Sequence, residues 1–307
     1  LPISMPPIVE CIPNFSEGRR AAVIAQIVAA IDRVRGVRVL HQTSDSDHNR
    51  TVVTFAGTPT AVLSAAFDAI RVAADVIDMD AHRGVHPRIG ATDVVPLVPI
   101  ADITLAECAD LARQLGARVG RELALPVYLY EAAATTDQRR NLAHIRRGEY
   151  EALKQNIDTP ERHPDFGAPQ IGKAGAVAIG ARSALIAYNV YLNSDDVRVA
   201  RHIARTIRQS NGGFVGVKAL GLQVDGRAQV SMNLTDYKRT PVHLVLEAIR
   251  REAARYGVLI AESELIGLMP QDALWSAAAY YLQLHDFTPD RILEQRLNSA
   301  DFDDAPD

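Results

Sequence analysis

Short apolar runs alternate with longer stretches of helical periodicity along most of this chain. In the first half, runs rich in β-branched residues predict strands at residues 8–13, 37–42, 51–56, 94–100 and 127–130. Apolar residues at helical spacing predict helices at residues 20–34, 58–78, 104–123 and 137–155, the last with a break near Gly148. Strands that alternate with helices in this way indicate an α/β fold.

Local signals refine three of these elements. Thr58 followed by Pro59 is a typical helix start, and Thr104 with Glu107 three positions later forms a capping box. The strand at 94–100 contains two prolines, which cannot donate ladder hydrogen bonds. We therefore expect this strand near the edge of its sheet.

A stretch rich in proline and glycine, residues 159–175, predicts a linker. Beyond it the pattern predicts strands at 184–192, 215–224, 228–234 and 258–261, and helices at 194–209, 240–256, 271–284 and 289–297. Ser194 and Thr240 are the expected starts of two of these helices, and Asp225-Gly226 predicts a hairpin turn. The acidic tail, residues 301–307, is expected to be frayed.

The two halves are similar in size, which predicts two subdomains joined near residues 176–184, with bounds of about 7–180 and 181–298. Strands joined by hairpins are antiparallel neighbours, so mixed sheets are expected rather than one doubly wound parallel sheet. The predicted fold class is α/β, of the α+β type. It consists of two α/β subdomains, each a mixed β-sheet covered by helices.

Composition narrows the class of protein. The 307 residues are 48% hydrophobic and 23% charged, and the net charge of −4 with a pI near 6.2 argues against a nucleic-acid partner. The two cysteines, Cys11 and Cys108, are too few for a disulfide framework and predict a reducing, cytoplasmic location. No apolar run approaches the roughly 20 residues of a membrane span. Residues 1–7 lack the basic and apolar regions of a signal peptide.

The segment from Asp78 to Gly90 carries the strongest chemical signal. It contains two histidines, two arginines and two aspartates together with two glycines and one proline. Histidine exchanges protons near neutral pH, and arginine binds carboxylates through paired hydrogen bonds. The segment is therefore typical of a site that holds an anionic substrate beside a proton shuttle.

Other interpretations of these polar segments remain open. His82 and His86 have the spacing of a zinc pair, but Gly84 and Pro87 disfavour a continuous helix, so a metal-free site is favoured. Alternatively, the histidines only form hydrogen bonds within a structured loop. The polar turn at residues 45–50 either faces a ligand or is a hairpin turn that uses Asp and Asn for their turn chemistry.

Several ordered motifs resemble those of one enzyme family. They are VECIPNFSEG at residues 9–18, HNRTV at 48–52, IDM at 77–79, HPRIGATD at 86–93, PVYLY at 126–130, PDFG at 164–167 and QVSMNLTD at 229–236. Together they strongly resemble the glutamate formimidoyltransferase (formiminotransferase) family, in its stand-alone form without a cyclodeaminase domain. The resemblance covers about residues 8–297.

The resemblance implies a reaction and its participants. Members of this family pass the formimino group of N-formimino-L-glutamate to N5 of tetrahydrofolate, which yields 5-formiminotetrahydrofolate and L-glutamate during histidine breakdown. It further implies a substrate tunnel between the subdomains, with the folate in it, and a cytoplasmic homodimer. The expected partners are these small molecules alone, with tetrahydrofolate as co-substrate and no metal.

The resemblance also implies roles for particular residues. His86 takes the place of the catalytic histidine, and Val85 stands beside it where many members carry Glu. The expected folate-binding loop is Gly167, Ala168, Pro169, Gln170, Ile171, Gly172, Lys173, Ala174 and Gly175, one residue shorter than the vertebrate loop and without its aromatic residues. The expected substrate-binding residues are Asn14, Asp45, Asn49, Arg50, His82, Arg88 and Asn233.

The residue types fit this chemistry without the family name. One histidine can take a proton from the attacking nitrogen and return it to the departing nitrogen. The cationic formimino group is suited to a carboxylate, for which Asp45, Asp47 and Asp78 are candidates. Arg50, Arg88 and Lys173 are suited to the carboxylates of glutamate and folate.

Two rival functions remain open at this point. One is a related folate enzyme that acts on 5-formyltetrahydrofolate, and the lack of a phosphate-binding loop counts against an ATP-using version of it. The other is a non-catalytic folate-binding protein, against which the presence of His86 counts.

Overall fold

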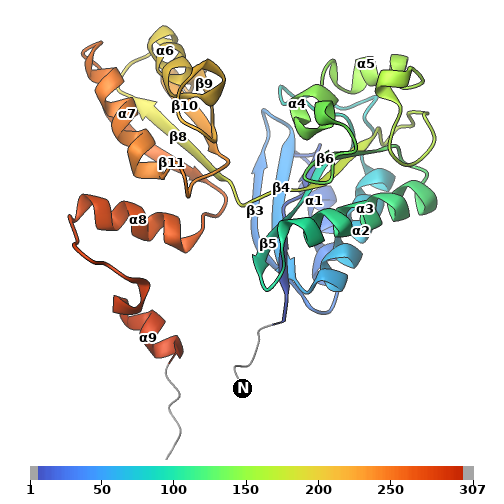
Figure 1. Ribbon diagram of the computed structural model, residues 1–307. Coiled ribbons are helices and arrows are strands. Elements are labelled where there is room, and N and C mark those ends of the chain that lie inside the picture. The colour runs from blue at the N-terminus through green and yellow to red at the C-terminus, as the bar shows by residue number, and fades with distance from the viewer. Residues whose placement is uncertain (1–5, 300–307) are drawn as a thin grey trace, which may run out of the picture. The chain divides into compact units, whose positions relative to one another are not determined.

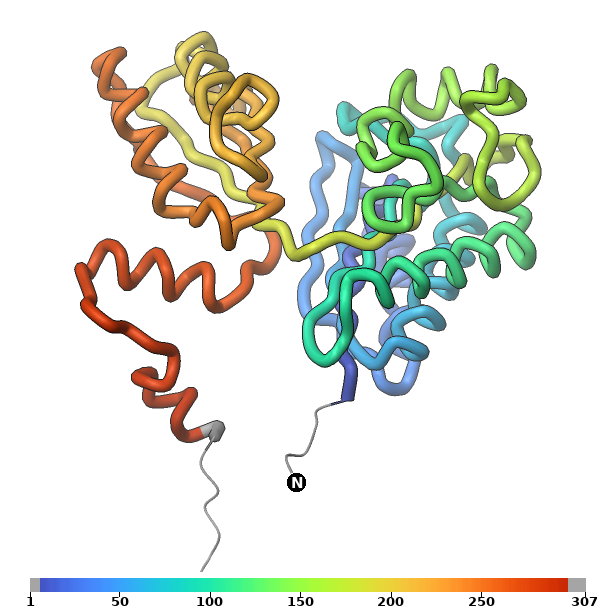
Figure 2. Tube along the Cα trace, in the orientation of Figure 1, coloured from blue at the N-terminus to red at the C-terminus, as the bar shows by residue number. Residues whose placement is uncertain are grey.

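A computed structural model describes residues 6–299, and the tail expected to fray, 301–307, lies outside them. The chain divides into two compact units, with the boundary between Ser183 and Ala184. Both units combine β-sheet with covering helices, which confirms the predicted α/β class (Figures 1 and 2). No helix among the described residues is long and apolar enough to cross a membrane.

The first unit is built on a seven-stranded mixed sheet. Its strands are β1 (Ile8–Cys11), β2 (Asn14–Phe15), β3 (Val37–Asp45), β4 (Arg50–Gly57), β5 (Thr92–Ala101), β6 (Val127–Glu131) and β7 (Val177–Ala181). The strand order is β1-β4-β2-β5-β7-β6, and β3 pairs with β4. β7 is parallel to β5 and β6, whereas the other pairs are antiparallel. The sequence pattern did not predict β7, because it placed these residues in the join between the halves.

The strand β5 lies inside the sheet, so the prediction of an edge position was wrong. It pairs with β1 and β2 on one side and with β7 on the other. Pro99 pairs with Val9 at a register shift, and the Pro96 carbonyl still accepts a hydrogen bond from the Ile12 amide at 3.2 Å. The prolines are tolerated because the ladder between β5 and β1 is already irregular there.

Helices cover both faces of this sheet. They are α1 (Ala21–Asp32), α2 (Pro59–Val76), α3 (Leu105–Glu122), α4 (Leu142–Ile145) and α5 (Glu149–Asn156), with 3₁₀ turns η1 (Asp137–Arg140) and η2 (Pro160–Arg162). Leu129 belongs to the core under α1, α2 and α3, whereas its neighbour Tyr128 packs with residues of α4 and α5. This alternation is that of a strand buried on both faces. The capping box of Thr104 and Glu107 starts α3 as predicted.

Residues 159–175 belong to the first unit and are not a linker between the units. Asp165 accepts a hydrogen bond from the Leu129 amide at 2.7 Å, and the Val127 amide donates to the Phe166 carbonyl at 2.9 Å. The many prolines and glycines of this segment therefore shape a packed loop against β6 rather than a mobile connection.

The second unit contains a four-stranded sheet in the order β11-β8-β10-β9. Its elements are β8 (Ile186–Leu192), α6 (Val197–Ile207), η3 (Gln209–Asn211), β9 (Val217–Val224), β10 (Arg227–Leu234), α7 (Val242–Ala254), β11 (Ile260–Ile266), α8 (Gln271–Tyr281), η4 (Pro289–Arg291) and α9 (Leu293–Ser299). All its pairs are antiparallel, so the expected mixed sheet is corrected here. The predicted hairpin turn at Asp225-Gly226 is confirmed, because both residues have positive φ between β9 and β10.

Two helix starts in this unit differ from the prediction. The N-cap of α6 is Asp196, whose carboxylate accepts a hydrogen bond from the Arg198 amide at 2.9 Å, and not Ser194. The N-cap of α7 is Pro241, while the Thr240 hydroxyl donates to the Val215 carbonyl at 2.7 Å. The Ser194 hydroxyl instead accepts a hydrogen bond from the Asp196 amide at 3.1 Å within the loop before α6, whereas Thr240 joins the start of α7 to the loop before β9.

Candidate active site

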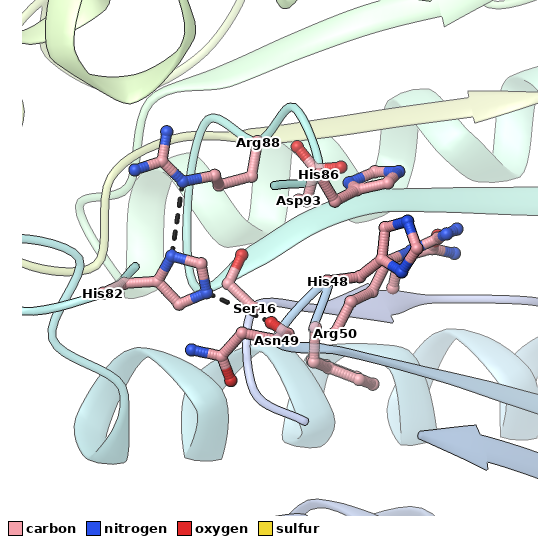
Figure 3. Close-up of a pocket in the computed structure, with 10 residues that line it drawn as sticks. Ser16, His48, Asn49, Arg50, His82, His86, Arg88 and Asp93 are labelled. Atoms are coloured by element: carbon pink, nitrogen blue, oxygen red, sulfur yellow. Dashed lines mark hydrogen bonds between the residues drawn. The ribbon is translucent and has the colours of Figure 1, made fainter. Parts of the chain in front are cut away.

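A small pocket opens in the first unit, around the start of β4 and the loop between α2 and β5 (Figure 3). It contains about 200 Å³ of empty space. Its lining residues are Asn14, Phe15, Ser16, His48, Asn49, Arg50, His82, His86, Arg88 and Asp93. The structure thus brings together His86 and most of the predicted substrate-binding residues, from segments far apart along the chain, whereas Asp45, Asn233 and the predicted folate-binding loop do not line this pocket.

The loop that carries the two histidines, residues 77–91, is held in a fixed position. The Met79 amide donates to the Lys173 carbonyl at 2.8 Å. Gly84 lies directly against the turn between β3 and β4, where an added Cβ would be 2.4 Å from the His48 carbonyl oxygen. Only glycine permits this close approach, which brings the histidine loop beside the turn that carries His48.

His82 is buried, and both of its ring nitrogens have partners within the protein. Nε2 lies 3.1 Å from the Asn49 carbonyl oxygen, and Nδ1 lies 3.3 Å from Nε of Arg88, which can only donate. The arrangement therefore fits a neutral ring that donates from Nε2. Burial lowers the pKa of His82, which also favours the neutral form. This geometry supports a positioning role for His82.

Arg88 is occupied by the protein's own acceptors. Its guanidinium donates to Glu149 at 2.6 Å and to both carboxylate oxygens of Glu151, at 2.8 and 2.6 Å. Its side chain is only 7% exposed, and hydrogen bonds to Glu151 raise its pKa further. We expected Arg88 to bind substrate, but these contacts favour a structural role in which it joins the histidine loop to α5.

His86 is half-buried beside the pocket and faces positive charge. Burial, together with the charges of Arg50 and Arg146, lowers the pKa of His86 to about 2. His48 acts in the same direction. The His86 ring is therefore neutral at physiological pH, in the form that can accept a proton.

His48 is a pocket residue that was not among the predicted site residues. Its ring packs edge-on against that of His86, with centroids 6.3 Å apart. Nδ1 of His48 lies 2.8 Å from Asp45, and the same carboxylate accepts hydrogen bonds from the Asp47 and His48 amides, both at 2.8 Å. The spacing of Asp45 and His48 in a tight turn was the available signal, since an Asp at the start of such a turn can hold a side chain three residues later.

Arg50 places a guanidinium without a carboxylate partner among the described residues at the pocket. Its Nε donates to the side-chain oxygen of Asn14 at 2.9 Å, and Nη2 contacts the same oxygen. Within residues 6–299 it has no ion pair with a carboxylate. Burial lowers the pKa of Arg50 to about 10, and Arg146 adds to this effect.

Asp93 and Arg146 form a buried ion pair that the sequence did not reveal. The Asp93 side chain, 3% exposed, contacts Nη2 of Arg146 and accepts a hydrogen bond from the Ile89 amide at 2.9 Å. The Nε of Arg146 is buried without a hydrogen-bond partner. Arg146 follows α4, and a single basic residue among four in that region carried no distinguishing signal.

The expected folate loop lies against the histidine loop. Its amide at Gly175 bonds to the Gly172 carbonyl at 3.0 Å, and a Cβ on Gly175 would lie 2.4 Å from the Ile89 carbonyl oxygen. Gly167 is similarly tight against Leu125. These two glycines are thus required by internal packing. Gly172 has open space around it.

Two further nominated residues lie outside this pocket. Lys173 is largely exposed and lies 3.6 Å from Asp78. Asn233 is exposed on β10 of the second unit, in register with Ala187 and Lys218. Neither contact assigns these residues to a ligand.

Among the described residues no three His, Cys, Asp or Glu side chains are grouped so as to hold a metal ion. The zinc interpretation needs His82 and His86 as ligands. For His82 this would require displacing Arg88 from Nδ1 or Asn49 from Nε2. The geometry therefore favours the metal-free interpretation.

The sequences of both units match models of a known protein family. Residues 8–182 match the N-terminal subdomain of the formiminotransferase domain, and residues 187–295 match the formiminotransferase domain. The chain belongs to the formiminotransferase family.

Particular relatives define the resemblance more closely. The chain is 49% identical to glutamate formimidoyltransferase of Thermoplasma acidophilum, over 95% of this chain and 98% of that protein. It is 45% identical to glutamate formimidoyltransferase of Streptococcus pyogenes serotype M1, over 95% and 99%. It is 42% identical to formimidoyltransferase-cyclodeaminase of Gallus gallus, of which it covers 53%.

Proposed function

We propose that this protein is a glutamate formimidoyltransferase, which transfers the formimino group of N-formimino-L-glutamate to N5 of tetrahydrofolate. The observation that carries the proposal is the pocket, in which a neutral His86 lies beside a half-buried Arg50 that has no carboxylate partner among the described residues. The identity of 49% and 45% to two glutamate formimidoyltransferases, in each case over 95% of this chain, supports the same assignment.

The reaction requires one proton to move between two nitrogens. N5 of tetrahydrofolate attacks the amidinium carbon and forms a tetrahedral intermediate. N5 then loses its proton, the nitrogen of glutamate gains one, and the bond between that nitrogen and the formimino carbon breaks. L-Glutamate leaves, and 5-formiminotetrahydrofolate remains. We assign the proton transfer to His86, because its neutral ring can accept a proton from N5 and return it to the departing nitrogen.

His48 and Asp45 are placed to assist this step. The Asp45 carboxylate lies 2.8 Å from Nδ1 of His48 and accepts hydrogen bonds from the His48 and Asp47 amides, which fixes the turn with the His48 ring beside that of His86. Burial opposes ionisation of Asp45, but the hydrogen bonds from His48 and Asp47 outweigh it and lower the pKa of the carboxyl group. A carboxylate in this position also suits the cationic formimino group.

The folate is assigned to the loop 167–175, beside the histidine loop. The pocket is small, with about 200 Å³ of empty space that includes open solvent, so we assign to it the reacting groups and not a whole folate. Lys173 is the cation of this loop and is exposed enough to meet the folate carboxylates. We further propose that the enzyme is cytoplasmic, acts as a homodimer and needs no metal.

The proposal is tested with purified protein, tetrahydrofolate and N-formimino-L-glutamate, with products followed by mass spectrometry in the presence and absence of a strong chelator. The expected result is 5-formiminotetrahydrofolate and L-glutamate in equal amounts, with or without the chelator. Turnover of 5-formyltetrahydrofolate with no formimino transfer would favour the first rival function. Folate binding without any turnover would favour the non-catalytic one.

A further inference from the structure

The surroundings of His86 carry more positive than negative charge. Among residues 6–299, Arg50 donates only to Asn14, and Arg146 has a single carboxylate partner, Asp93, with its Nε left unpaired. Two guanidiniums therefore share one buried carboxylate. A half-buried cation without a counter-ion and a buried donor without an acceptor are both costly, and one bound anion would relieve both.

The remaining charged groups around His86 do not change this balance. His48, on the turn before β4, is paired with Asp45, and Arg88 of the histidine loop is paired with glutamates at the start of α5. Asp93, on β5, is engaged by Arg146 and by the Ile89 amide. From β4, β5 and the end of α4, the charge that His86 meets is thus positive overall.

We propose that Arg50 and Arg146 form the binding subsite for a carboxylate of the formimino donor, and that this carboxylate supplies the negative charge that lets His86 take up a proton. The inference rests on the function proposed above and adds that binding of the donor is coupled to proton uptake by His86. In the empty site His86 is a poor proton acceptor, because nearby cations and burial both oppose the imidazolium. When the formimino donor is bound, its carboxylate stabilises the imidazolium, and His86 can then accept the proton from N5.

The size of the effect follows from Coulomb's law. A unit charge at about 6 Å, with an effective dielectric constant of about 20, changes the pKa of a neighbouring group by on the order of two units. The added charge is negative, so the pKa of His86 rises. The coupling also predicts an order of events in which the donor binds before proton transfer from N5 can begin.

The test is a histidine NMR titration of the whole protein between pH 2 and 8, because the pKa of His86 in the free protein is about 2. The His86 signal is assigned by its loss in His86→Gln. The probes are glutarate, which carries the donor's carboxylates, and glutaramide, which has the same length without charge. We expect saturating glutarate to raise the His86 pKa by one unit or more relative to glutaramide. Identical titration with both probes would overturn the proposal.

A pair of matched variants locates the subsite. Arg146→Gln removes one cation, so the His86 pKa should rise in the free protein and glutarate should bind at pH 7 about tenfold more weakly, as seen by calorimetry. Arg139→Gln is the control, because Arg139 and Asp165 form a similarly buried pair, 16% and 7% exposed compared with 18% and 3% for Arg146 and Asp93. Equal effects of both variants would contradict the assignment. If Arg146→Gln does not fold, the comparison of the two probes on the unaltered protein still decides.

A third probe separates the two possible sources of the carboxylate. p-Aminobenzoyl-L-glutamate carries the carboxylates of the folate tail, and we expect it to leave the His86 titration unchanged. A shift with this probe and none with glutarate would overturn the assignment to the donor. Because these measurements need no turnover, a glutarate shift in a protein that transfers no formimino group would refute the proposed function and leave the anion subsite intact.

Discussion

Arg88 gives the clearest test of how the pocket is held together. In the structure its buried side chain joins the histidine loop to α5 through hydrogen bonds to His82, Glu149 and Glu151. Its residue type alone suggested a substrate ligand. Replacing it with methionine keeps an apolar stem and removes every donor. The two interpretations then predict different losses, one in stability and the other in substrate binding.

The magnitude follows from the exposure of the partners. Glu149 and Glu151 are 40% and 56% exposed, so solvent screening limits each ion pair to about 1 kcal/mol. Loss of the hydrogen bond to His82 adds about 1 kcal/mol, because the Nδ1 of a buried ring loses its partner. We expect Arg88→Met to lower the free energy of unfolding by about 2–3 kcal/mol in total.

The assay is urea denaturation of Arg88→Met, Glu151→Gln and the double variant. The coupling energy between the two residues should be about 1 kcal/mol. The exposed helical pair Asp110 and Arg113, with side chains 68% and 43% exposed, is the control and should couple by less than about 0.5 kcal/mol. An unchanged unfolding free energy, with a KM for formiminoglutamate raised about tenfold or more, would refute the structural role and restore Arg88 as a substrate ligand.

Four further predictions concern the reaction and its pH dependence. His86→Ala should lower kcat by about 10² or more while folate affinity is retained, and unchanged turnover would remove His86 from the mechanism. Because the pKa of His86 is depressed, the unfolded chain binds its proton first as pH falls below about 6.5, so stability should drop by up to ~1.4 kcal/mol per pH unit, and less steeply in His86→Gln. Lys173→Ala should raise the folate KM at nearly constant kcat, more so for polyglutamates, and a fall in kcat at constant KM would place Lys173 at the chemistry. His48→Gln should lower kcat by about tenfold, with Asp45→Asn close to it and the double variant no worse than either, whereas additive losses would show that the two residues do not act as a unit.

Much of the fold could be predicted because it depends on local pattern. The helix that starts at the Thr104 capping box and the hairpin at Asp225-Gly226 are specified by neighbouring residues. The position of β5 and the existence of β7 depend on which strands meet in space, so the two prolines of β5 and the short run at 177–181 were misleading. Tertiary pairing overrides local propensity in such cases.

The candidate site was likewise predictable where it depends on local sequence and not where it depends on tertiary contacts. His82 and His86 lie within one short segment whose composition is unusual, and it was nominated on that basis. The groups that decide how those histidines behave, Glu151 on Arg88 and Arg146 on Asp93, come from residues more than 50 positions away. No spacing rule connects such residues, because they meet only through the packing of α4 and α5 on the sheet.

The most direct test of the central claim is the transfer of a doubly labelled group. N-Formimino-L-glutamate with ¹³C and ¹⁵N in the formimino group is incubated with tetrahydrofolate and the protein, and the folate product is weighed by mass spectrometry. The account predicts that carbon and nitrogen arrive together, so the folate product is heavier by both labels, at a rate that depends on His86. A product that carries the carbon label without the nitrogen, or no labelled folate at all, would contradict it.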